Sequence, residues 1–414
     1  MKGITTKFKL LPLTVALASV LTPTIASAVD APEDFKFTGY ARYGAHISND
    51  AYDHDNGGWK STDSLIKIDQ AITGNSAGRL GNEGNGGELQ FTKGLKGPND
   101  TIWNIGFMVD HWGDNIHVKK LYASATNVLE SNPGATFWGG RDFHQRPQTN
   151  LADFFVMFHD GQGGGVKDLD VGFAKFDLGV VGAIADGGAD GQYGNSVNDN
   201  GNYAVTTKLH DIGLGSVGTL DLYANYGFST KITDTESSDR DIDTTAYQVA
   251  AIFKTNWSKG SNKFGFRYSD NSADSVFNKT EGQDELYLGL DGTFYATESF
   301  VVDYSAAIAN RTLESDSSID RTEYNVIVRP MYSWNNIHST WLEFGATAAD
   351  YDNGGQNAAW KATISQNMSI NAFGLGRPML RLYANIGEVE NNQTQPDQGT
   401  VDVFAMGLMF ESWW

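Results

Sequence analysis

The chain of 414 residues has no cysteine, only 9 prolines and an unusually small share of basic residues. Without cysteine it can form no disulfide framework, thiol nucleophile or thiolate metal site. Lys and Arg total 30 against 50 Asp and Glu, a net charge of −20. This acidity argues against nucleic acid as a partner, because a phosphate backbone requires a basic surface. Aromatic residues make up 12%, which is too many for a disordered acidic chain.

Long apolar runs are also missing. Beyond residue 28 no stretch of 18 apolar residues exists, so no transmembrane helix is expected. Residues 1–28 resemble a signal peptide: basic residues precede a short apolar run, Leu10–Leu21, and Ala26-Ser27-Ala28 is a cleavage site. We therefore predict an exported chain whose domain spans residues 29–414. It is then periplasmic, secreted, or inserted in an outer membrane as a closed barrel.

What the mature chain does contain is hydrophobic alternation with a period of two residues. Thr219–Tyr226 places Leu220, Leu222, Ala224 and Tyr226 on one face. Asn262–Ser269 and Arg377–Ile386 repeat the pattern, which indicates strands with one apolar and one polar face. Segments of about ten residues give roughly 16–20 strands, within the size range of transmembrane barrels.

Periodicity alone does not separate a soluble sandwich from a membrane barrel, because both alternate. Aromatic residues at the ends of the apolar faces favour the barrel, as do short connections such as Ala174-Lys175 and Trp334–Ile337 facing long polar ones such as Asn49–Thr62 and Ser269–Asp284. The last segment, Phe404–Trp414, ends on an aromatic residue of its apolar face, and Trp413 has the opposite parity. We predict an all-β, transmembrane antiparallel barrel with Trp413 facing the lumen.

The chain resembles the maltoporin family of sugar-specific outer-membrane porins. The resemblance rests on five stretches in the order of the family: Phe37–Arg42 (FTGYAR), Arg79–Glu83 (RLGNE), Pro133–Asp153 with Phe143–Arg146 (FHQR), Asp168–Phe173 (DLDVGF), and Arg329–Tyr332 (RPMY) with the terminal Trp-Trp. It implies about 18 strands, a third loop folded inward as a constriction, a homotrimer, and sugars that slide along an aromatic stripe.

The resemblance carries over three aromatic stripe positions. Tyr40 matches the tyrosine of the first strand, Trp112 the tryptophan that a neighbouring subunit contributes at the entrance, and Trp413 the exit tryptophan. Three others do not carry over: the chain has Gly86-Gly87, Ser261 and Leu375 there. Whether Trp257 or Phe373 takes a vacant place stays open. The shortened stripe weakens the case for long maltodextrins as substrates.

The charged lumen positions of the family, its polar track, are matched more completely in this chain than the aromatic stripe. Its basic positions correspond to Arg42, Arg79, Lys119 and Arg146, its acidic positions to Glu88 and Asp153, and a constriction tyrosine to Phe155. Lysine at residue 119 keeps the charge but lacks the fork of a guanidinium. The alternative is a lattice of salt bridges that holds the inward loop without contacting sugar.

No constellation for chemistry or for a cofactor is found. The spacing of His111 and His117 suits no common zinc site. Gly161–Gly165 (GQGGG) lacks the ending of a phosphate-binding loop and is expected to be a flexible part of the inward loop. We therefore predict no catalytic residue, metal or cofactor.

The resulting hypothesis is a trimeric outer-membrane porin for maltose, maltodextrin-like or other oligosaccharides in a Gram-negative bacterium, in contact with lipid and lipopolysaccharide. Three alternatives stay open: a general small-solute porin, a barrel enzyme, and a secreted sugar-binding β-protein.

Overall fold

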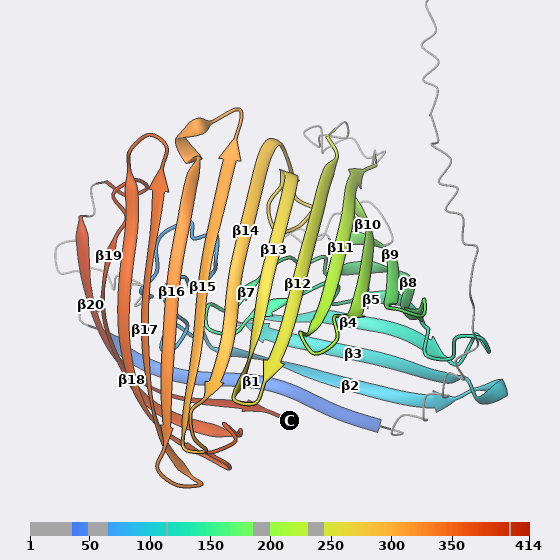
Figure 1. Cartoon of the computed structure of the whole chain (residues 1–414), viewed down its shortest axis with the longest axis horizontal. Helices are drawn as coiled ribbons and strands as arrows, with labels where there is room; N and C mark the ends of the chain where they lie inside the picture. The colour runs from blue at the N-terminus through green and yellow to red at the C-terminus, as the bar shows by residue number, and fades with distance from the viewer. Residues whose placement is uncertain (1–34, 49–64, 113–114, 185–198, 231–243, 397–398) are drawn as a thin grey trace, which may run out of the picture.

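The computed structural model describes residues 35–48, 65–112, 115–184, 199–230, 244–396 and 399–414. Within these ranges the chain forms one closed barrel of 18 antiparallel strands, seen from the side in Figure 1. No helix of the described residues is long and apolar enough to cross a membrane. The predicted signal peptide lies outside the described residues, so its cleavage stays a prediction.

Each barrel strand pairs with the next one along the chain. The strands are β1 (Phe35–Ser48), β2 (Gly86–Lys96), β3 (Ile102–Trp112), β4 (Asn115–Thr126), β5 (Thr136–Asp142), β8 (Gly161–Asp170), β9 (Lys175–Ile184), β10 (Asp199–Gly213), β11 (Thr219–Ser229), β12 (Ala246–Trp257), β13 (Gly260–Ser272), β14 (Lys279–Tyr295), β15 (Phe300–Leu313), β16 (Arg321–Ser333), β17 (His338–Tyr351), β18 (Gln356–Ser369), β19 (Met379–Glu390) and β20 (Thr400–Trp413).

The first and last strands close the barrel. β20 pairs with β1 in a register that runs from Tyr40 opposite Trp413 to Ser48 opposite Ala405. The backbone N–H of Trp414 then donates to the carbonyl of Gly39 at 3.1 Å, which extends the pairing to the last residue. Closure leaves no strand edge, the condition for a sheet that must satisfy its backbone in lipid.

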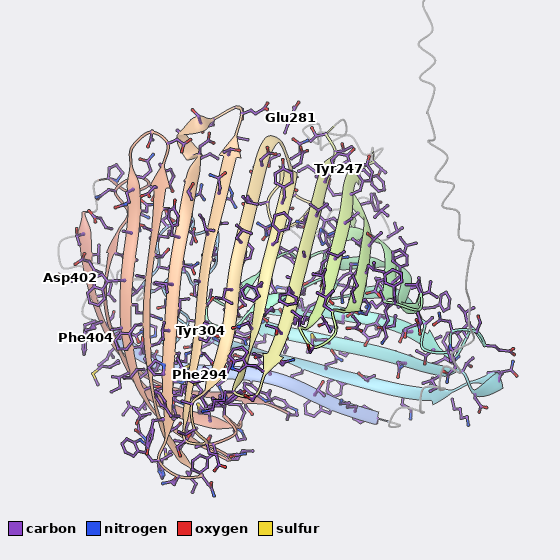
Figure 2. The ribbon with its side chains drawn as sticks, viewed as in Figure 1. Tyr247, Glu281, Phe294, Tyr304, Asp402 and Phe404 are labelled. Carbon is purple, nitrogen blue, oxygen red and sulfur yellow. The ribbon has the colours of Figure 1, made fainter. Side chains whose placement is uncertain are left out.

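The apolar faces of the strands point outward. On β19, Leu382 is 50% exposed whereas its neighbour Arg381 is 3% exposed, and the same contrast recurs between Ile364 and Lys361 on β18. Outward aromatic residues such as Tyr247 and Phe404 stand on the wall of the barrel in Figure 2. This settles what periodicity left open, because a soluble sandwich would bury that face.

Two long connections fold into the barrel from the same end. They are residues 65–85, between β1 and β2, and residues 143–160, between β5 and β8, which contain the two-residue strands β6 (Gln148–Thr149) and β7 (Phe154–Phe155). The two connections bind each other: the N–H of Asn75 donates to Ala152 at 2.8 Å and that of Arg79 to Leu151 at 2.9 Å. These contacts confirm the predicted inward constriction loop, residues 143–160. They also show a second inward segment, residues 65–85, which the sequence did not predict.

The inward segments are fixed to the lumen wall by apolar packing and buried charge. Leu151, Phe154 and Met157 pack against Ile252 and other residues of β11–β16. The carboxylate of Glu323 accepts the N–H of Ile72, and the ammonium of Lys361 donates to the carbonyl of Leu80 at 2.8 Å. Because buried charges need partners, these contacts specify one position for the segments.

Two expectations about the connections are wrong. Gly161–Gly165 is not a flexible part of the inward loop but lies in β8, where a Cβ on Gly163 would collide with the carbonyl oxygen of Val180. Hydrogen bonds from β5 and β9 on both sides outweigh the low strand propensity of glycine. The predicted loop Ser269–Asp284 is also too long, since β13 and β14 leave only residues 273–278 between them. The short connection Trp334–Ile337 is confirmed.

Candidate functional site: the pore constriction

The two inward segments and the wall formed by β1–β3 enclose a hollow of about 620 Å³, which we call the constriction. It brings together eight of the predicted site residues and adds Phe143 and Gln148: the lining is Tyr40, Arg42, Arg79, Glu88, Trp112, Phe143, Arg146, Gln148, Asp153 and Phe155. Three of these residues point into the lumen because alternate residues of a strand face the same side. They are Tyr40 and Arg42 on β1 and Glu88 on β2.

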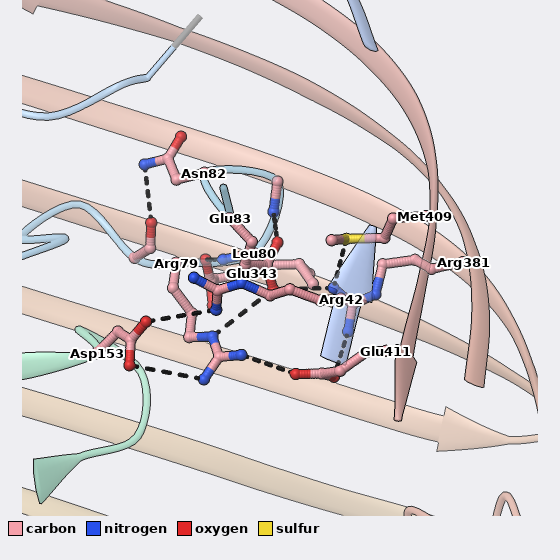
Figure 3. A network of polar contacts seen from close by, with 12 residues as sticks. Arg42, Arg79, Leu80, Asn82, Glu83, Asp153, Glu343, Arg381, Met409 and Glu411 are labelled. Carbon is pink, nitrogen blue, oxygen red and sulfur yellow. Dashed lines mark hydrogen bonds and ion pairs between the residues drawn. The ribbon is translucent and has the colours of Figure 1, made fainter. Parts of the chain in front are cut away.

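A network of ion pairs joins both inward segments to the wall, as the dashed lines in Figure 3 show. Arg79 lies 2.8 Å from Glu411 of β20, 3.6 Å from Glu83 and 4.0 Å from Asp153, and Asp153 is 3.5 Å from Arg42. Burial lowers the pKa of Arg79, but the carboxylates around it outweigh burial and hold this pKa above its ordinary value. A permanently charged, anchored guanidinium therefore stands beside the pore.

Guanidinium groups stack on the aromatic rings of the constriction. Arg146 lies between two rings, 3.9 Å from the centroid of Phe143 and 4.1 Å from that of Phe155. On the facing wall, Arg42 lies 4.9 Å from the ring of Trp112 and 6.0 Å from that of Tyr40. Stacking holds these cations in place and combines flat aromatic surfaces with fixed hydrogen-bond donors.

An ion pair with Asp160 positions the guanidinium of Arg146. The carboxylate of Asp160 lies 3.2 Å from Nε of Arg146 and accepts the backbone N–H of His144 at 2.9 Å. Burial nevertheless raises the pKa of Asp160 to about 6, against the opposing charge of Arg146. The carboxyl that positions this constriction arginine therefore changes charge close to neutral pH.

Trp112 lies in the pore of its own chain. It is the last residue of β3 and pairs with Gly86 of β2, and its ring centroid is 6.2 Å from that of Tyr40. A Cβ on Gly86 would collide with the indole. The glycine that stands near a tyrosine of the family therefore makes room for Trp112 in the pore of its own chain, and its contribution to a neighbouring pore stays a prediction.

The two remaining predicted residues lie outside the constriction. Trp413 faces the lumen opposite Tyr40, as its parity predicts, and the guanidinium of Arg377 lies 4.3 Å from its ring. Lys119 sits at a bulge in the pairing of β4 with β3 and lies 3.3 Å from Asp110, so this ammonium is paired with the wall.

Of the two aromatic residues near vacant stripe positions, Trp257 does not fill one. Trp257 shares the exposed outer face of Tyr247 and Val249 on β12 and does not point into the lumen. Leu375 packs against the apolar cluster that includes Trp341 and Leu80. Phe373 lies, 37% exposed, in the connection between β18 and β19, and its place in the stripe stays open.

Sequence reasoning missed the carboxylate that organises the network. Glu411 is 4% exposed, contacts Arg79, Arg377 and Arg381, and accepts the hydroxyl of Tyr40 at 3.0 Å. The available signal was its inward parity, two residues before Trp413, since an inward carboxylate in a barrel wall requires basic partners.

One group of potential metal ligands exists among the described residues. Asp168, Asp177 and His210 place their ligand atoms within 4.8 Å of one another at the end of the barrel with short connections. The ammonium of Lys175 lies 3.7 Å from Asp168 and supplies positive charge there. The group contains a single histidine, and His210 is distant in sequence from both aspartates, which is why the spacing of histidines did not reveal it.

A closed strand barrel with an apolar exterior and a narrowed, charged lumen defines a porin of the bacterial outer membrane. The family model described as LamB porin matches residues 35–414, so the chain belongs to the LamB porin family.

The chain is similar to two maltoporins from Vibrio cholerae serotype O1. It is 27% identical to that of the Classical Ogawa strain, over 97% of this chain and 100% of the relative, and 27% identical to that of the El Tor Inaba strain, over 97% and 98%. Among solved structures, OccK10 (OpdN) of Pseudomonas aeruginosa has a TM-score of 0.51 at 10% identity, with 92% of this chain and 99% of that one covered. OccK3 (OpdO) of the same organism has a TM-score of 0.50 at 10% identity, covering 93% and 97%. At such identities these structures share the barrel fold alone.

Proposed function

We propose that the barrel is a passive, sugar-selective pore for maltose, maltodextrin-like or other oligosaccharides. The observation that carries the proposal is the composition of the constriction, where Tyr40 and Trp112 offer ring surfaces next to the charged side chains of Arg42, Glu88 and Asp153. A sugar ring presents an apolar face for stacking and hydroxyls at its edge, so this mixture suits it.

Transport needs contacts that are repeated and individually weak, so that a sugar both enters and leaves. Past the constriction a sugar meets Trp413, opposite Tyr40 on the next strand. The path thus offers the rings of Trp112, Tyr40 and Trp413 as stacking surfaces, with Arg42 on one face of Trp112 and Arg377 on one face of Trp413. Three rings, fewer than the six stripe positions of the family, favour short oligosaccharides over long ones.

The process involves diffusion and no chemical step, so the proposal includes no enzyme activity, metal or cofactor. The remaining partners are those of an outer-membrane porin in a Gram-negative cell: lipid and lipopolysaccharide around the barrel and two further copies of the chain in a homotrimer. The maltoporin relatives support the substrate class by their name.

Single-channel current of the purified protein in a planar bilayer tests this function. Maltose, maltotriose, sucrose and cellobiose are titrated in turn, and saturable block in three equal steps is expected for a trimer with one pore per subunit. Tyr40→Ala and Trp413→Ala should each weaken the block. Open channels that no sugar blocks, in a barrel that conducts ions normally, would contradict sugar selectivity and favour a general small-solute porin.

A further inference from the structure

The group formed by Asp168, Asp177 and His210, which we call the rim cluster, lies apart from the constriction. Three neighbouring strands supply it: β8 carries Asp168, β9 carries Asp177 and β10 carries His210, and the three strands lie side by side in Figure 1. Residues 171–174 join β8 to β9, and residues 214–218 join β10 to β11. Such short connections mark the periplasmic end of an outer-membrane barrel, so the cluster stands at the periplasmic rim.

Two β-bulges direct side chains into the rim cluster. In a regular strand His210 and its neighbour Asp211 would face opposite sides. The pairing of β10 with β11 shifts its register at these two residues, and Asp211 has a φ of 56°. The bulge lets both side chains reach one place, where Oδ2 of Asp211 lies 3.2 Å from Nδ1 of His210. A second bulge, in β8, holds Asp168 at a φ of 58°.

Both ring nitrogens of His210 face carboxylates, although the side chain is buried with 7% exposure. Its Nε2 lies 3.1 Å from Oδ1 of Asp177 and 3.6 Å from Oδ1 of Asp168, and its Nδ1 faces Asp211. A neutral imidazole has one N–H group and one nitrogen with a free lone pair. In either neutral tautomer a lone pair therefore points at a carboxylate oxygen. The arrangement requires either a second proton on the ring or a cation at Nε2.

The charge around the ring matches a divalent cation. The carboxylates of Asp168, Asp177 and Asp211 surround it, and the ammonium of Lys175 lies 3.7 Å from Asp168 and 3.9 Å from Asp211. These two distances are too long for hydrogen bonds, so Lys175 contributes charge without occupying the place between the ligand atoms. With a neutral imidazole, three carboxylates against one ammonium leave an excess of two negative charges.

The spacing and the kind of ligand atoms favour zinc. Zinc binds imidazole nitrogen and carboxylate oxygen at about 2.0–2.1 Å in tetrahedral geometry, which places neighbouring ligand atoms about 3.3 Å apart. The distances of 3.1 and 3.6 Å from Nε2 of His210 lie on either side of that value. Asp211 at Nδ1 forms the carboxylate–histidine pair that orients metal-bound imidazoles. Magnesium and calcium prefer oxygen ligands alone, so the imidazole selects against them.

We propose that Asp168, Asp177 and His210 bind one zinc ion per subunit at the periplasmic rim, with Asp211 as a positioning residue for the imidazole. The backbone N–H of Asp168 donates to Oδ1 of Asp177 at 2.7 Å, which fixes this carboxylate next to the ring. The side chain of Asp168 is 43% exposed, so water reaches the site as a fourth ligand. The bound ion joins three neighbouring strands. The site goes beyond the proposed sugar transport, which needs no metal and does not depend on it.

Equilibrium dialysis of the full barrel in detergent against zinc chloride at neutral pH tests the site, with bound metal measured by atomic emission. The parent should bind one ion per subunit, and His210→Ala should lose that ion. The matched control is His338→Ala, since His338 follows a short connection at the same end of the barrel and its Nδ1 lies 3.3 Å from the side-chain oxygen of Asn335. Asp211→Asn should keep the stoichiometry and weaken the affinity about 10- to 100-fold.

A second measurement reads the ion through the stability of the barrel. Zinc should raise the temperature at which the heat-modifiable band unfolds in the parent and in His338→Ala, but not in His210→Ala, because a ligand stabilises the state that binds it. The same band verifies folding, and Asp177→Asn replaces His210→Ala if that variant does not fold. Absence of zinc from the parent, or equal zinc in parent and His210→Ala, would overturn the site and leave a protonated imidazole among ion pairs. Equal affinity for magnesium or calcium would also overturn it.

Discussion

The indole of Trp112 lies against Gly86 of the neighbouring strand, in space that any larger residue at position 86 would occupy. The two residues are 26 positions apart in the chain, and antiparallel pairing of β2 with β3 brings them together. The pair places the indole next to the ring of Tyr40 in the same chain, where the proposed aromatic path begins.

Substitution of this glycine should therefore weaken sugar binding without changing the residue that stacks. Gly86→Leu is expected to displace the indole and to raise the half-blocking sugar concentration about fivefold, equivalent to about 1 kcal/mol for one stacking contact. The half-blocking concentration is measured by titrating maltotriose and recording the block of the ion current. Gly84→Ala is the control, since a Cβ there meets no atom within 4 Å. Equal sugar affinity in Gly86→Leu and the parent would show that the indole contributes nothing.

The Glu411 network should stabilise the barrel. Glu411→Gln removes the carboxylate shared by Arg79, Arg377 and Arg381 and leaves three cations near one another in the wall. Breaking a buried ion pair from one side costs about 3 kcal/mol, so the unfolding midpoint in guanidinium chloride should fall clearly. Asp100→Asn breaks the exposed pair with Lys96 and should leave the midpoint unchanged. Equal midpoints for the two variants would contradict a stabilising role.

Ion selectivity should depend on pH through Asp160. Because the pKa of this carboxyl is raised to about 6, it is ionised above that pH and balances Arg146, and it is neutral below. Acidification through pH 6 should therefore leave the guanidinium unbalanced and increase the permeability to chloride relative to potassium, read from the reversal potential. At every pH from about 5 to 8, Asp160→Asn should show the chloride-to-potassium permeability ratio that the parent protein shows only in acid. A transition near pH 6 that persists in Asp160→Asn would assign the effect to another group.

The terminal residue should matter for barrel closure. The backbone of Trp414 exchanges hydrogen bonds with Gly39 at 3.0 and 3.1 Å, and its ring lies 5.6 Å from that of Phe37 on the outer face. Removal of Trp414 should lower the yield of folded barrel, measured as the heat-modifiable band on a detergent gel. Trp413→Ala retains the outer contact and is expected to fold normally. Equal yields for the two variants would argue against this role of the outer ring.

The sequence by itself determined the membrane barrel and most of the constriction. Alternation of apolar and polar residues, as in Asn262–Ser269, depends only on the local pleat of a strand and is readable without the fold. Parity likewise placed Trp413 in the lumen, and the family resemblance selected eight residues that the structure brings together at the constriction. The leader peptide and the trimer stay predictions.

Only the tertiary structure decided the contacts between segments that are distant in the chain. The inward fold of residues 65–85 depends on acceptors such as Glu323 in β16, and the role of Glu411 depends on Arg79 in that same segment. Strand placement of Gly161–Gly165 required the neighbours β5 and β9. Closing the barrel brings these partners within hydrogen-bond distance. A local pattern cannot encode such pairings, because it reports which face a side chain takes and not what lies opposite that face.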